Sequence, residues 1–381
     1  MINSNALHKK NILFILQGGR GGTLEYVKYL LKRLNKEKYE TAVICHGEAY
    51  NELKSLGYNV HAVEMVREIS PVRDFLSLMK IIAFLLKNRP DIAYSHSTKA
   101  GVLGRLAAGI LKISNIYNPH GWSFNMKVSS PKKKLYILVE KIASLFADKI
   151  VAISESEYND ALAKKITKKR KIVLIKNGID LDKFDKRDGQ CFKRFLNIPD
   201  DYKVIGMVGR LTRQKSPQAF VEIARLVHGQ CLRCVFILVG DGGLREEVEK
   251  MIRKYNLENN FIITGWVENP ERYISVMDVG VLTSQWEGFG LVLVEMMACG
   301  KPVVASNVDG IPYVVRDKVD GFLCQPDDVQ EFAGCILKLL HNNDLYESMS
   351  DSACRHARDK FDLKRVIEQH EKLFNSLPND L

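Results

Sequence analysis

Short apolar runs alternate with longer amphipathic stretches along almost the whole chain. An apolar run of about four to eight residues is typical of a strand buried on both faces, and apolar residues three or four positions apart indicate a helix with one packed side. In the first half, the pattern predicts strands at 11–16, 40–45, 91–96, 115–119, 149–153 and 172–175, and helices at 23–35, 72–87, 100–111 and 131–147. In the second half, it predicts strands at 203–208, 235–239, 261–264, 279–283 and 302–306, and helices at 217–227, 244–255, 291–298, 329–340, 345–358 and 362–374.

Strands that alternate with helices predict parallel sheets covered on both faces, and two such series predict two Rossmann-like, doubly wound α/β domains. We expect domains at 1–185 and 186–360, and a helix at 361–381 that crosses back to the first domain. Ligands of open parallel sheets bind at the carboxyl ends of the strands. With two such sheets facing each other, we expect the site in the cleft between the domains.

The composition is that of a soluble globular protein, because 46% of the 381 residues are hydrophobic and 27% are charged. No apolar run approaches the ~20 residues that span a bilayer. The polar residues 1–10 lead straight into a predicted strand, so we expect no signal peptide. The eight cysteines form no paired framework. Scattered cysteines are typical of reduced proteins, so we expect a cytoplasmic location.

The net charge of +11 is concentrated between residues 127 and 176, which include thirteen Lys or Arg residues and five acidic ones. Such a surplus predicts an anionic partner, either a membrane surface or nucleic acid. Sites for single-stranded nucleic acid interleave aromatic with basic residues, and this segment contains only Tyr136, Phe146 and Tyr158. We therefore expect peripheral binding to the cytoplasmic face of an anionic membrane, and no nucleic-acid partner.

Part of this basic segment, 131–150, has the pattern of an amphipathic helix. We expect its apolar side to pack on the sheet of the first domain, as in an ordinary surface helix. That side consists of Leu135, Leu138, Val139, Ile142 and Leu145.

Residues 283–298 contain the strongest chemical signal. A polar turn carries Glu287 beside Gly288 and Gly290, and the helix that follows places Glu295 eight positions later, a little over two turns. A helix N-terminus offers unpaired N–H groups and a partial positive charge, which suit a phosphate. Ionised carboxylates only accept hydrogen bonds, so these two suit sugar hydroxyls. The segment therefore predicts a nucleotide-sugar site, although a Gly-rich turn beside a solvated Glu is the alternative.

Other loops of the second half add charge and an aromatic side chain. Arg210 and Lys215 follow the strand at 203–208, where a guanidinium fork and an ammonium could hold a diphosphate. Asp241, in a Gly-rich turn after the next strand, could contact the ligand or merely cap the following helix. Trp266 follows Gly265 and could border a planar base or pack internally.

Two loops of the first half are candidates as well. Residues 17–22 contain four glycines, which permit close approach of a ligand to the backbone without matching a Walker loop. His120 lies between Pro119 and Gly121 at a strand end, a position that core packing explains poorly. It could hydrogen-bond a sugar hydroxyl or a phosphate. His96, at another strand end, is a rival that could equally be a satisfied buried imidazole.

Together these loops resemble the retaining glycosyltransferases of family 4. The resemblance runs in order from about residue 11 to 300 and implies a GT-B fold, a nucleotide-sugar donor held mainly by the second domain, and neither a cofactor nor a catalytic metal. One departure is Ser216-Pro217 after Lys215, where the family usually has Gly. The motifs that carry the resemblance are the glycine loop at 18–22, Pro119-His120-Gly121, Asn177-Gly178-Ile179-Asp180, Gly209-Arg210-Leu211 with Lys215, Gly240-Asp241-Gly242, and Glu287-Gly288-Phe289-Gly290 with Glu295.

The resemblance implies a role for each matched residue. Arg210 and Lys215 would bind the donor diphosphate, and Glu287 would accept from the sugar hydroxyls. Glu295 would hold the ribose, and His120 would contact the donor sugar. We place the remaining donor contacts, including two backbone N–H groups at the helix start, at Gly18, Gly19, Gly209, Asp241, Gly242, Trp266, Gly288, Phe289, Gly290, Leu291 and Val292.

The segment 96–105 resembles the branch of the family that builds capsule, exopolysaccharide and O-antigen repeats, which usually works on lipid-linked acceptors. We therefore predict transfer of a hexose or N-acetylhexosamine from a nucleoside diphosphate, UDP, to a sugar hydroxyl of a lipid-linked acceptor, with retention at the anomeric carbon. The matched loops contain no convincing nucleophile, which favours a front-face reaction. The alternatives that stay open are a nucleotide-sugar 2-epimerase on the same fold, a basic nucleic-acid-binding protein and a non-catalytic sugar-nucleotide sensor.

Overall fold

A computed structural model of the chain describes residues 9–19, 21–66, 68–184 and 189–378. These residues form two compact units, one of 9–176 together with 366–378 and one of 177–365. The chain therefore leaves the first unit after Lys176. The boundary expected between residues 185 and 186 lies outside the described residues.

The first unit is built on a parallel sheet with the strand order β3-β2-β1-β4-β5-β6-β7 among the described residues. From β1 the chain extends the sheet in one direction, and from β4 it extends the sheet in the other, so the junction of β1 and β4 is a topological switch point. The strands are β1 (Lys10–Leu16), β2 (Tyr39–Cys45), β3 (Val60–Ala62), β4 (Ile92–His96), β5 (Ser114–Asn118), β6 (Lys149–Ala152) and β7 (Ile172–Leu174).

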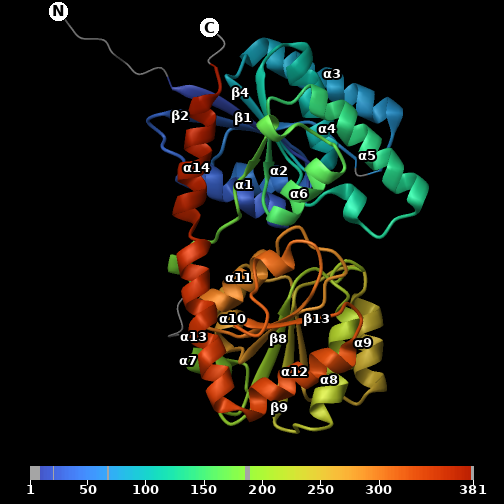
Figure 1. The fold of residues 1–381 in the computed structure, drawn as a ribbon, viewed down its shortest axis with the longest axis vertical. Coiled ribbons are helices and arrows are strands. Elements are labelled where there is room, and N and C mark those ends of the chain that lie inside the picture. The colour runs from blue at the N-terminus through green and yellow to red at the C-terminus, as the bar shows by residue number, and fades with distance from the viewer. Residues whose placement is uncertain (1–8, 20, 67, 185–188, 379–381) are drawn as a thin grey trace, which may run out of the picture. The chain divides into compact units, whose positions relative to one another are not determined.

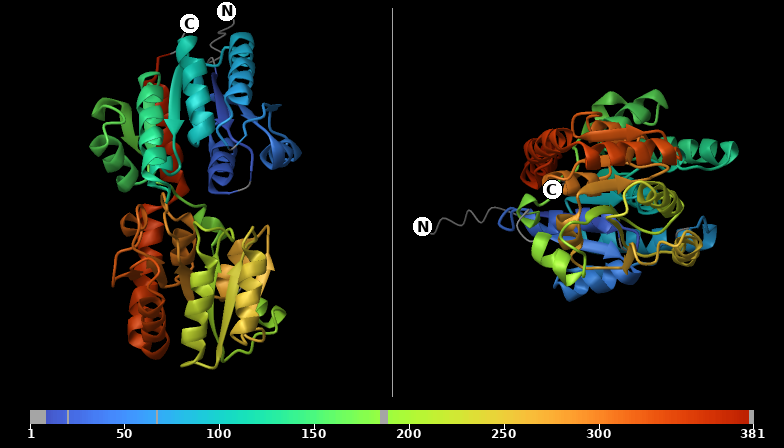
Figure 2. Two further views of the ribbon diagram at one scale, coloured as in Figure 1. Left: turned by 90° about the vertical axis from the view of Figure 1, so that its right-hand side faces the viewer. Right: turned by 90° about the horizontal axis from the view of Figure 1, so that it is seen from below.

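Helices cover both faces of this sheet. The helices are α1 (Gly22–Arg33), α2 (Gly47–Ser55), α3 (Pro71–Asn88), α4 (Thr98–Ile110), α5 (Ser130–Leu145), α6 (Glu155–Ala163) and the last part of α14 (Leu363–Ser376). Right-handed crossovers that run in opposite directions from a switch point place α1 and α4 on opposite faces. α3, α4 and α5 pack in a row on one face (Figures 1 and 2), and α14 packs with α1 on the other.

The second unit repeats this plan with the strand order β10-β9-β8-β11-β12-β13 among the described residues. α8, α9 and α12 cover one face, and α10, α11 and α13 cover the other (Figure 1). The strands are β8 (Lys203–Val208), β9 (Cys234–Val239), β10 (Phe261–Gly265), β11 (Val279–Leu282), β12 (Val303–Ser306) and β13 (Gly321–Cys324). The helices are α7 (Gly189–Phe195), α8 (Pro217–His228), α9 (Arg245–Lys254), α10 (Pro270–Val276), α11 (Leu291–Ala298), α12 (Val329–His341) and α13 (Asn343–Lys360).

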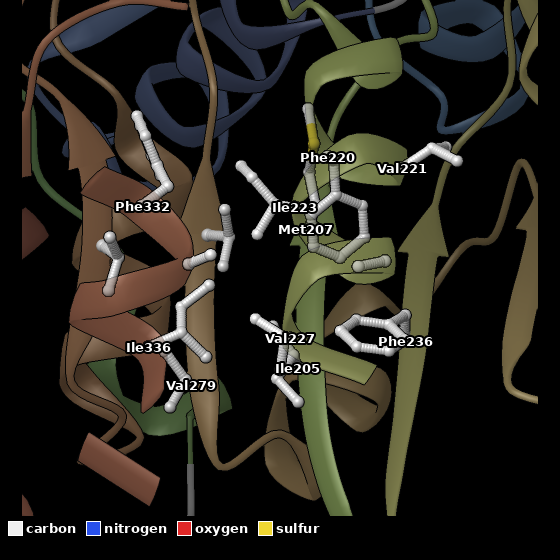
Figure 3. Packing of buried hydrophobic residues seen from close by; sticks show 14 of the residues in the cluster. Ile205, Met207, Phe220, Val221, Ile223, Val227, Phe236, Val279, Phe332 and Ile336 are labelled. Carbon is white, nitrogen blue, oxygen red and sulfur yellow. The ribbon is translucent and has the colours of Figure 1, made fainter. Parts of the chain in front are cut away.

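The core of the second unit lies between its sheet and the pair α8 and α12. Figure 3 shows Phe220 and Ile223 of α8 and Ile336 of α12 beside Ile205 and Phe236 of the strands. All five side chains are fully buried. Burying such a side chain stabilises the fold by about 1.5–3 kcal/mol, so this cluster provides a rigid base for the loops at the strand ends.

The prediction of two doubly wound α/β domains is confirmed. Every predicted strand and helix is present, with ends that differ by one or two residues. Several short elements were not predicted. α2 buries only Ala49 and Leu53, and β3 is a three-residue strand at the sheet edge. The short helices α6, α7 and α10 and the edge strand β13 were not predicted either.

α14 begins in the second unit and belongs to the first from Val366 on, which agrees with the predicted crossover helix. Its buried His370 accepts from Tyr26 of α1 at 2.9 Å. Phe374 packs against Tyr39 and Tyr94 of the sheet. These contacts attach the end of the chain to the first unit.

The prediction that the apolar side of α5 packs on the sheet is wrong. Leu135, Leu138, Ile142 and Leu145 are 45–74% exposed, and α5 buries Glu140, Ala143 and Ser144 instead. The orientation of α5 is explained by its contact with the neighbouring helix α4. Glu140 forms an ion pair with the buried Arg105 of α4 at 2.8 Å, and this polar contact turns the apolar stripe outward.

Candidate functional site

Loops from neighbouring strands of the second unit lie at one edge of its sheet. They follow β9, β8, β11 and β12, which are adjacent in that order. Carboxyl ends of parallel strands lie at the same edge, and β8 and β11 form the switch point where ligands of such sheets bind. The loops after β8 and β11 carry Arg210, Lys215 and Glu287.

Lys215 and Glu287 form a direct ion pair across these two loops, Nζ of the lysine donating to Oε2 of the carboxylate. Their side chains are only 15% and 14% exposed. Ser284 Oγ donates to the same carboxylate oxygen at 3.2 Å. The structure thus brings together Lys215, which we expect to bind the donor diphosphate, and Glu287, which we expect to bind the sugar hydroxyls.

Further hydrogen bonds join the β8 and β11 loops. Thr283 Oγ1 donates to the carbonyl oxygens of Lys215 at 2.8 Å and Ser216 at 3.0 Å. The backbone N–H of Gln285 donates to the carbonyl of Gln214 at 2.7 Å. Ser216 adopts a left-handed backbone conformation and precedes Pro217, the first residue of α8. Ser216-Pro217, which replaces the usual Gly of the family, therefore forms the turn into α8. Lys215 still pairs with Glu287.

Asp309 and Gly310, in the loop after β12, complete the support of Glu287. Asp309 Oδ2 accepts the backbone N–H of Glu287 at 3.0 Å, and the N–H of Gly310 donates to the Glu287 carbonyl at 3.0 Å. A Cβ on Gly310 would lie 2.1 Å from the carbonyl oxygen of Gly288, so only glycine fits there. Sequence reasoning missed both residues, and the one available signal was an Asp-Gly turn after a buried strand.

α11 begins at Leu291, as predicted, and its N-terminus faces no capping side chain. The N-cap residue is Gly290, at φ 86°, and it has no side chain with which to cap the first turn. The N–H groups of Leu291 and Val292 therefore have no partner from the cap residue, which suits an anionic ligand. Glu295 lies partly buried in the next turn.

Phe289 lies two residues before the start of α11, and its side chain is packed in the core. It is 2% exposed and packs edge-on against Phe361, with ring centroids 5.6 Å apart. Phe289 and Gly288 could therefore touch a ligand only through their backbone groups.

The glycines after β8 and β9 let two backbones approach. A Cβ on Gly240 would lie 2.1 Å from the carbonyl oxygen of Gly209, and a Cβ on Gly242 would lie 2.5 Å from that of Leu211. The close contact between the two loops therefore requires glycine at position 242, independently of any contact with a ligand. The atoms nearest to a Cβ on Gly209 would belong to the Lys215 side chain, at 3.5 Å.

Asp241 does not cap α9, whose N-cap is Leu244. Its carboxylate accepts from the backbone of Gly242 at 2.8 Å and pairs with Arg245 at 3.2 Å. Trp266, after β10, is 49% exposed. Arg210 is exposed at the start of the β8 loop.

The first unit carries the remaining candidates at the carboxyl ends of its own strands. Gly18 follows β1, and its backbone N–H donates to His46 Nδ1 at 3.3 Å. A Cβ on Gly18 would lie 2.3 Å from the His46 carbonyl oxygen, whereas Gly19, at φ 120°, has no neighbour within 4 Å of such an atom. Gly19 is thus the more open of the two.

His120 follows β5 in a strained backbone conformation, at φ 52°. Its backbone N–H donates to Asn118 Oδ1 at 3.1 Å, and its ring Nε2 lies 2.9 Å from Nδ1 of the fully buried His96. The His120 side chain is partly exposed. Burial, followed by the neighbouring His370, lowers the pKa of His120 to about 3, so its imidazole is neutral at pH 7. A strained, partly exposed imidazole held by a second imidazole is an arrangement that functional sites favour.

The described part of the chain contains no cluster of three or more His, Cys, Asp or Glu side chains that could hold a metal ion. Within the same residues, none of the helices combines the length and apolarity that crossing a bilayer requires.

Two family models match the chain. "Glycosyltransferase Family 4" matches residues 20–183, and "Glycosyl transferases group 1" matches residues 190–356. The chain belongs to the glycosyltransferases of family 4. The glycosyltransferase is 29% identical over 316 residues to the UDP-Gal:alpha-D-GlcNAc-diphosphoundecaprenol alpha-1,3-galactosyltransferase of Escherichia coli, covering 81% of each chain.

A second relative and a solved structure agree with this assignment. The glycosyltransferase is 27% identical over 332 residues to the capsular polysaccharide biosynthesis glycosyltransferase CapM of Staphylococcus aureus, covering 85% of this chain and 87% of CapM. Anabaena Alr3699/HepE in complex with UDP and glucose matches with a TM-score of 0.84 at 23% identity, covering 97% of this chain and all of that one. This likeness shows that the glycosyltransferase has the GT-B fold.

Proposed function

We propose that this glycosyltransferase transfers a hexose or N-acetylhexosamine from UDP to a sugar hydroxyl of a lipid-linked acceptor, with retention at the anomeric carbon. The observation that carries the proposal is the ion pair of Lys215 and Glu287 at the β8–β11 switch point, next to the uncapped N-terminus of α11. A cation and helix N–H groups suit a diphosphate, whereas a carboxylate suits sugar hydroxyls. The pair therefore fits the point where sugar and diphosphate join.

In this proposal the protein stabilises the negative charge that develops on the departing diphosphate. Arg210 and Lys215 supply fixed positive charge, and the N–H groups of Leu291 and Val292 supply dipoles. The leaving diphosphate takes the proton of the acceptor hydroxyl on the same face as the new bond, so neither a protein nucleophile nor a metal ion is needed. Glu287 and His120 hold the sugar, Glu295 holds the ribose and Trp266 borders the base.

The relatives support the choice of substrates. The E. coli relative is named for UDP-galactose as donor and a GlcNAc-diphosphoundecaprenol as acceptor, and CapM is named for capsular polysaccharide biosynthesis. HepE was solved with UDP and glucose. A sugar on a polyprenyl diphosphate is an acceptor that lies at a membrane surface, which agrees with the basic character of this chain.

A thermal-shift panel of UDP-, GDP-, ADP- and TDP-sugars tests the donor. Binding to the folded chain at a hundredfold excess over Kd adds about 2.7 kcal/mol of stability, and we expect this only with UDP-sugars. Incubation of the best donor with and without a GlcNAc-diphosphopolyprenol then tests the reaction. We expect a new glycoside only with the acceptor. Conversion of the donor to its 2-epimer without any acceptor would identify an epimerase and overturn the proposal.

We further propose that the outward sides of α3 and α5 rest on an anionic membrane. We call these sides the α3/α5 surface. On it, large apolar side chains are 46–73% exposed on α3 and 45–74% exposed on α5. Exposed apolar stripes on two helices that cover the same face of a sheet indicate an interaction site. The surface consists of Val72, Phe75, Leu76, Met79, Leu86, Leu135, Leu138, Ile142 and Leu145.

The charges of the two helices favour a lipid surface as the partner. Their acidic residues are Asp74, paired with Lys99, and Glu140, paired with Arg105. Every exposed charged side chain of α3 and α5 is basic: Arg73, Lys80, Lys87, Lys132, Lys133 and Lys134. A basic rim around an apolar stripe matches anionic headgroups around acyl chains.

Vesicle sedimentation tests this surface with two matched triple variants. Changing Lys132, Lys133 and Lys134 to Gln removes three charges beside the apolar stripe, and changing Lys168, Lys169 and Arg170 to Gln removes three charges elsewhere in the same unit. At ~1 kcal/mol per basic residue, we expect the first triple to bind phosphatidylglycerol vesicles about a hundredfold more weakly, and the second to lose much less. Equal losses, or no binding of the wild type, would contradict the proposal.

A further inference from the structure

His96 has no role in the proposed reaction, yet its ring forms a hydrogen bond with the ring of His120. It ends β4, is fully buried and has its Nδ1 2.9 Å from Nε2 of His120. Aromatic rings surround it, with Tyr94 at 4.2 Å and Phe14 at 5.8 Å between ring centroids. Among the described residues, its other ring nitrogen, Nε2, has no hydrogen-bond partner.

Two arrangements of protons satisfy the bond between these neutral rings. In the first, His96 carries its proton on Nδ1 and donates to Nε2 of His120, so that His120 must carry its own proton on Nδ1. In the second, His120 donates from Nε2, and His96 must then carry its proton on Nε2. The second arrangement places an N–H group without a partner inside an aromatic pocket. The first leaves only a lone pair there, and orphaned buried N–H groups are the rarer of the two in proteins.

We propose that His96 is a positioning residue that fixes His120 with its proton on Nδ1, so that His120 presents an N–H donor to the donor sugar. The inference rests on the proposed function for the identity of the sugar, but the placement of the proton rests on the two rings alone. Nε2 of His120 is occupied by His96. Nδ1 is therefore the atom that remains for a ligand of this partly exposed side chain.

The groups packed around the pair keep both rings neutral. Burial lowers the pKa of His96 well below its usual value, with His120 and His370 adding to the effect. Tyr26, Tyr94 and Asn118 contact the pair, and none of these side chains is charged at neutral pH. A neutral ring with its proton on the atom that meets the ligand donates there and cannot accept. His120 therefore binds a sugar oxygen and does not remove the proton of the acceptor hydroxyl.

Nitrogen NMR of the histidine side chains tests the proton placement directly. Two-bond ¹H–¹⁵N correlation spectra of the full chain, labelled at its nine histidines, distinguish a ring protonated on Nδ1 from one protonated on Nε2. We expect His120, assigned through a His120→Asn variant, to be protonated on Nδ1 at pH 7.5. This is the less common form of a free imidazole in water, so its presence needs a cause. A His120 ring protonated on Nε2 in the wild type would overturn the inference.

Two substitutions at position 96 test the cause. His96→Leu removes the donor, and we expect His120 to move to the form protonated on Nε2 and the rate of transfer to fall about tenfold, as for loss of one hydrogen bond. His96→Asn places an amide N–H near the position of Nδ1, and we expect it to restore the Nδ1 form and most of the rate. A His120 ring that stays in the Nδ1 form in a folded His96→Leu protein would show that His96 does not set it.

The measurements separate this inference from the proposed function. If His96→Leu fails to fold, the wild-type spectrum still decides the proton placement, because it needs no variant at position 96. If the wild type transfers no sugar but His120 is protonated on Nδ1, the proposed function fails and the role of His96 stands. If transfer occurs and His120 is protonated on Nε2, the inference fails alone.

Discussion

Glu287 is held by residues from three loops before any ligand arrives. Lys215 and Ser284 bind its carboxylate, and Asp309 binds its backbone N–H. The first two contacts act on the carboxylate and the third on the backbone, so both the side chain and the backbone are fixed. A group fixed in this way needs little reorganisation on binding, which is how enzymes use hydrogen bonds to stabilise a transition state.

The cations beside Glu287 provide the first test at this scale. Arg210→Ala and Lys215→Ala each remove a positive charge from the proposed leaving diphosphate, and we expect kcat to fall ~10²–10³-fold in each. Thermal unfolding should show an intact fold. Lys338→Ala, which removes an exposed charge from α12, is the matched control and should keep its activity. Near-normal turnover in both site variants would remove these residues from the mechanism.

Asp309 gives a second test, because its role is support of the acid. Asp309→Ala leaves the Glu287 N–H without its acceptor, and we expect a loss of about 1–2 kcal/mol of stability and roughly tenfold in kcat/KM. Asp309→Asn keeps an acceptor oxygen and should lose much less of both. Urea unfolding and initial rates measure the two effects. If the Asn and Ala variants behave alike, the hydrogen bond to Glu287 is not what matters at this position.

Sequence reasoning found Lys215 and Glu287 but not Asp309, for a physical reason. The first two follow strands with recognisable motifs, and parallel strands bring their carboxyl ends together wherever they lie in the chain. Asp309 acts through a backbone N–H, and any residue type can offer that group. The protonation of His120 was equally hidden, because it depends on a contact with His96 that no motif encodes.

At the scale of the element, one buried ion pair decides how α5 lies. Arg105 of α4 and Glu140 of α5 are both 0% exposed and meet at 2.8 Å. Tyr117 of β5 donates to the same carboxylate at 3.0 Å, and the Arg105 guanidinium lies 3.7 Å from the centre of the Tyr117 ring. The pair thus joins α4, α5 and the sheet, and it leaves the apolar stripe of α5 outside.

Breaking this pair should be costly, since it leaves a buried charge without a partner. We expect Glu140→Ala to reduce the free energy of unfolding by about 3–5 kcal/mol. Replacing both members with apolar residues of similar size, Arg105→Met with Glu140→Leu, should restore much of the loss. Urea unfolding of the three proteins measures this. A double variant as unstable as Glu140→Ala would mean that the charge left behind is not the cause.

The elements themselves could be read from the sequence, but the orientation of α5 could not. The hydrophobic period identified every long helix and every strand of the two sheets except the edge strands β3 and β13, because those elements bury apolar residues in regular positions. The same rule failed for α5. An apolar stripe normally marks the packed side, and here a polar pair took that side instead.

At the scale of the whole molecule, α14 connects the end of the chain to the support of His120. Its His370 donates from Nδ1 to the Val366 carbonyl at 2.7 Å, so Nε2 must accept, and Tyr26 and Tyr94 lie 2.9 and 3.1 Å from it. Tyr26 in turn packs edge-on against His120, with ring centroids 4.8 Å apart. The C-terminal helix α14 therefore supports the candidate site residue His120 through Tyr26.

This arrangement predicts sensitivity to acid. Burial lowers the pKa of His370 to about 4, against about 6.5 in an unfolded chain. Between pH 6.5 and 4, His370 is protonated in the unfolded state but not in the folded state. The free energy of unfolding is therefore at its full value above pH 6.5 and falls as the pH approaches 4. The contribution of His370 is roughly 3 kcal/mol at ~1.4 kcal/mol per pH unit.

Urea unfolding between pH 7.5 and 4.5 measures this contribution by comparison with His370→Gln. The variant keeps an acceptor for the tyrosines but does not titrate. As the pH is lowered, the free energy of unfolding of the variant should fall less steeply, because the variant takes up about one proton fewer on unfolding. Parallel curves for the two proteins would show that His370 titrates normally in the folded chain.

The most direct measurement of the central claim is transfer of a labelled sugar from its UDP donor to a GlcNAc-diphosphopolyprenol, with EDTA present and the anomeric configuration of the product read by NMR. We expect transfer at the same rate with and without EDTA, and a product with the anomeric configuration of the donor. Inversion at the anomeric carbon, loss of turnover on adding EDTA, or no transfer from any nucleotide-sugar would contradict a site that grips the diphosphate with Arg210, Lys215 and the start of α11.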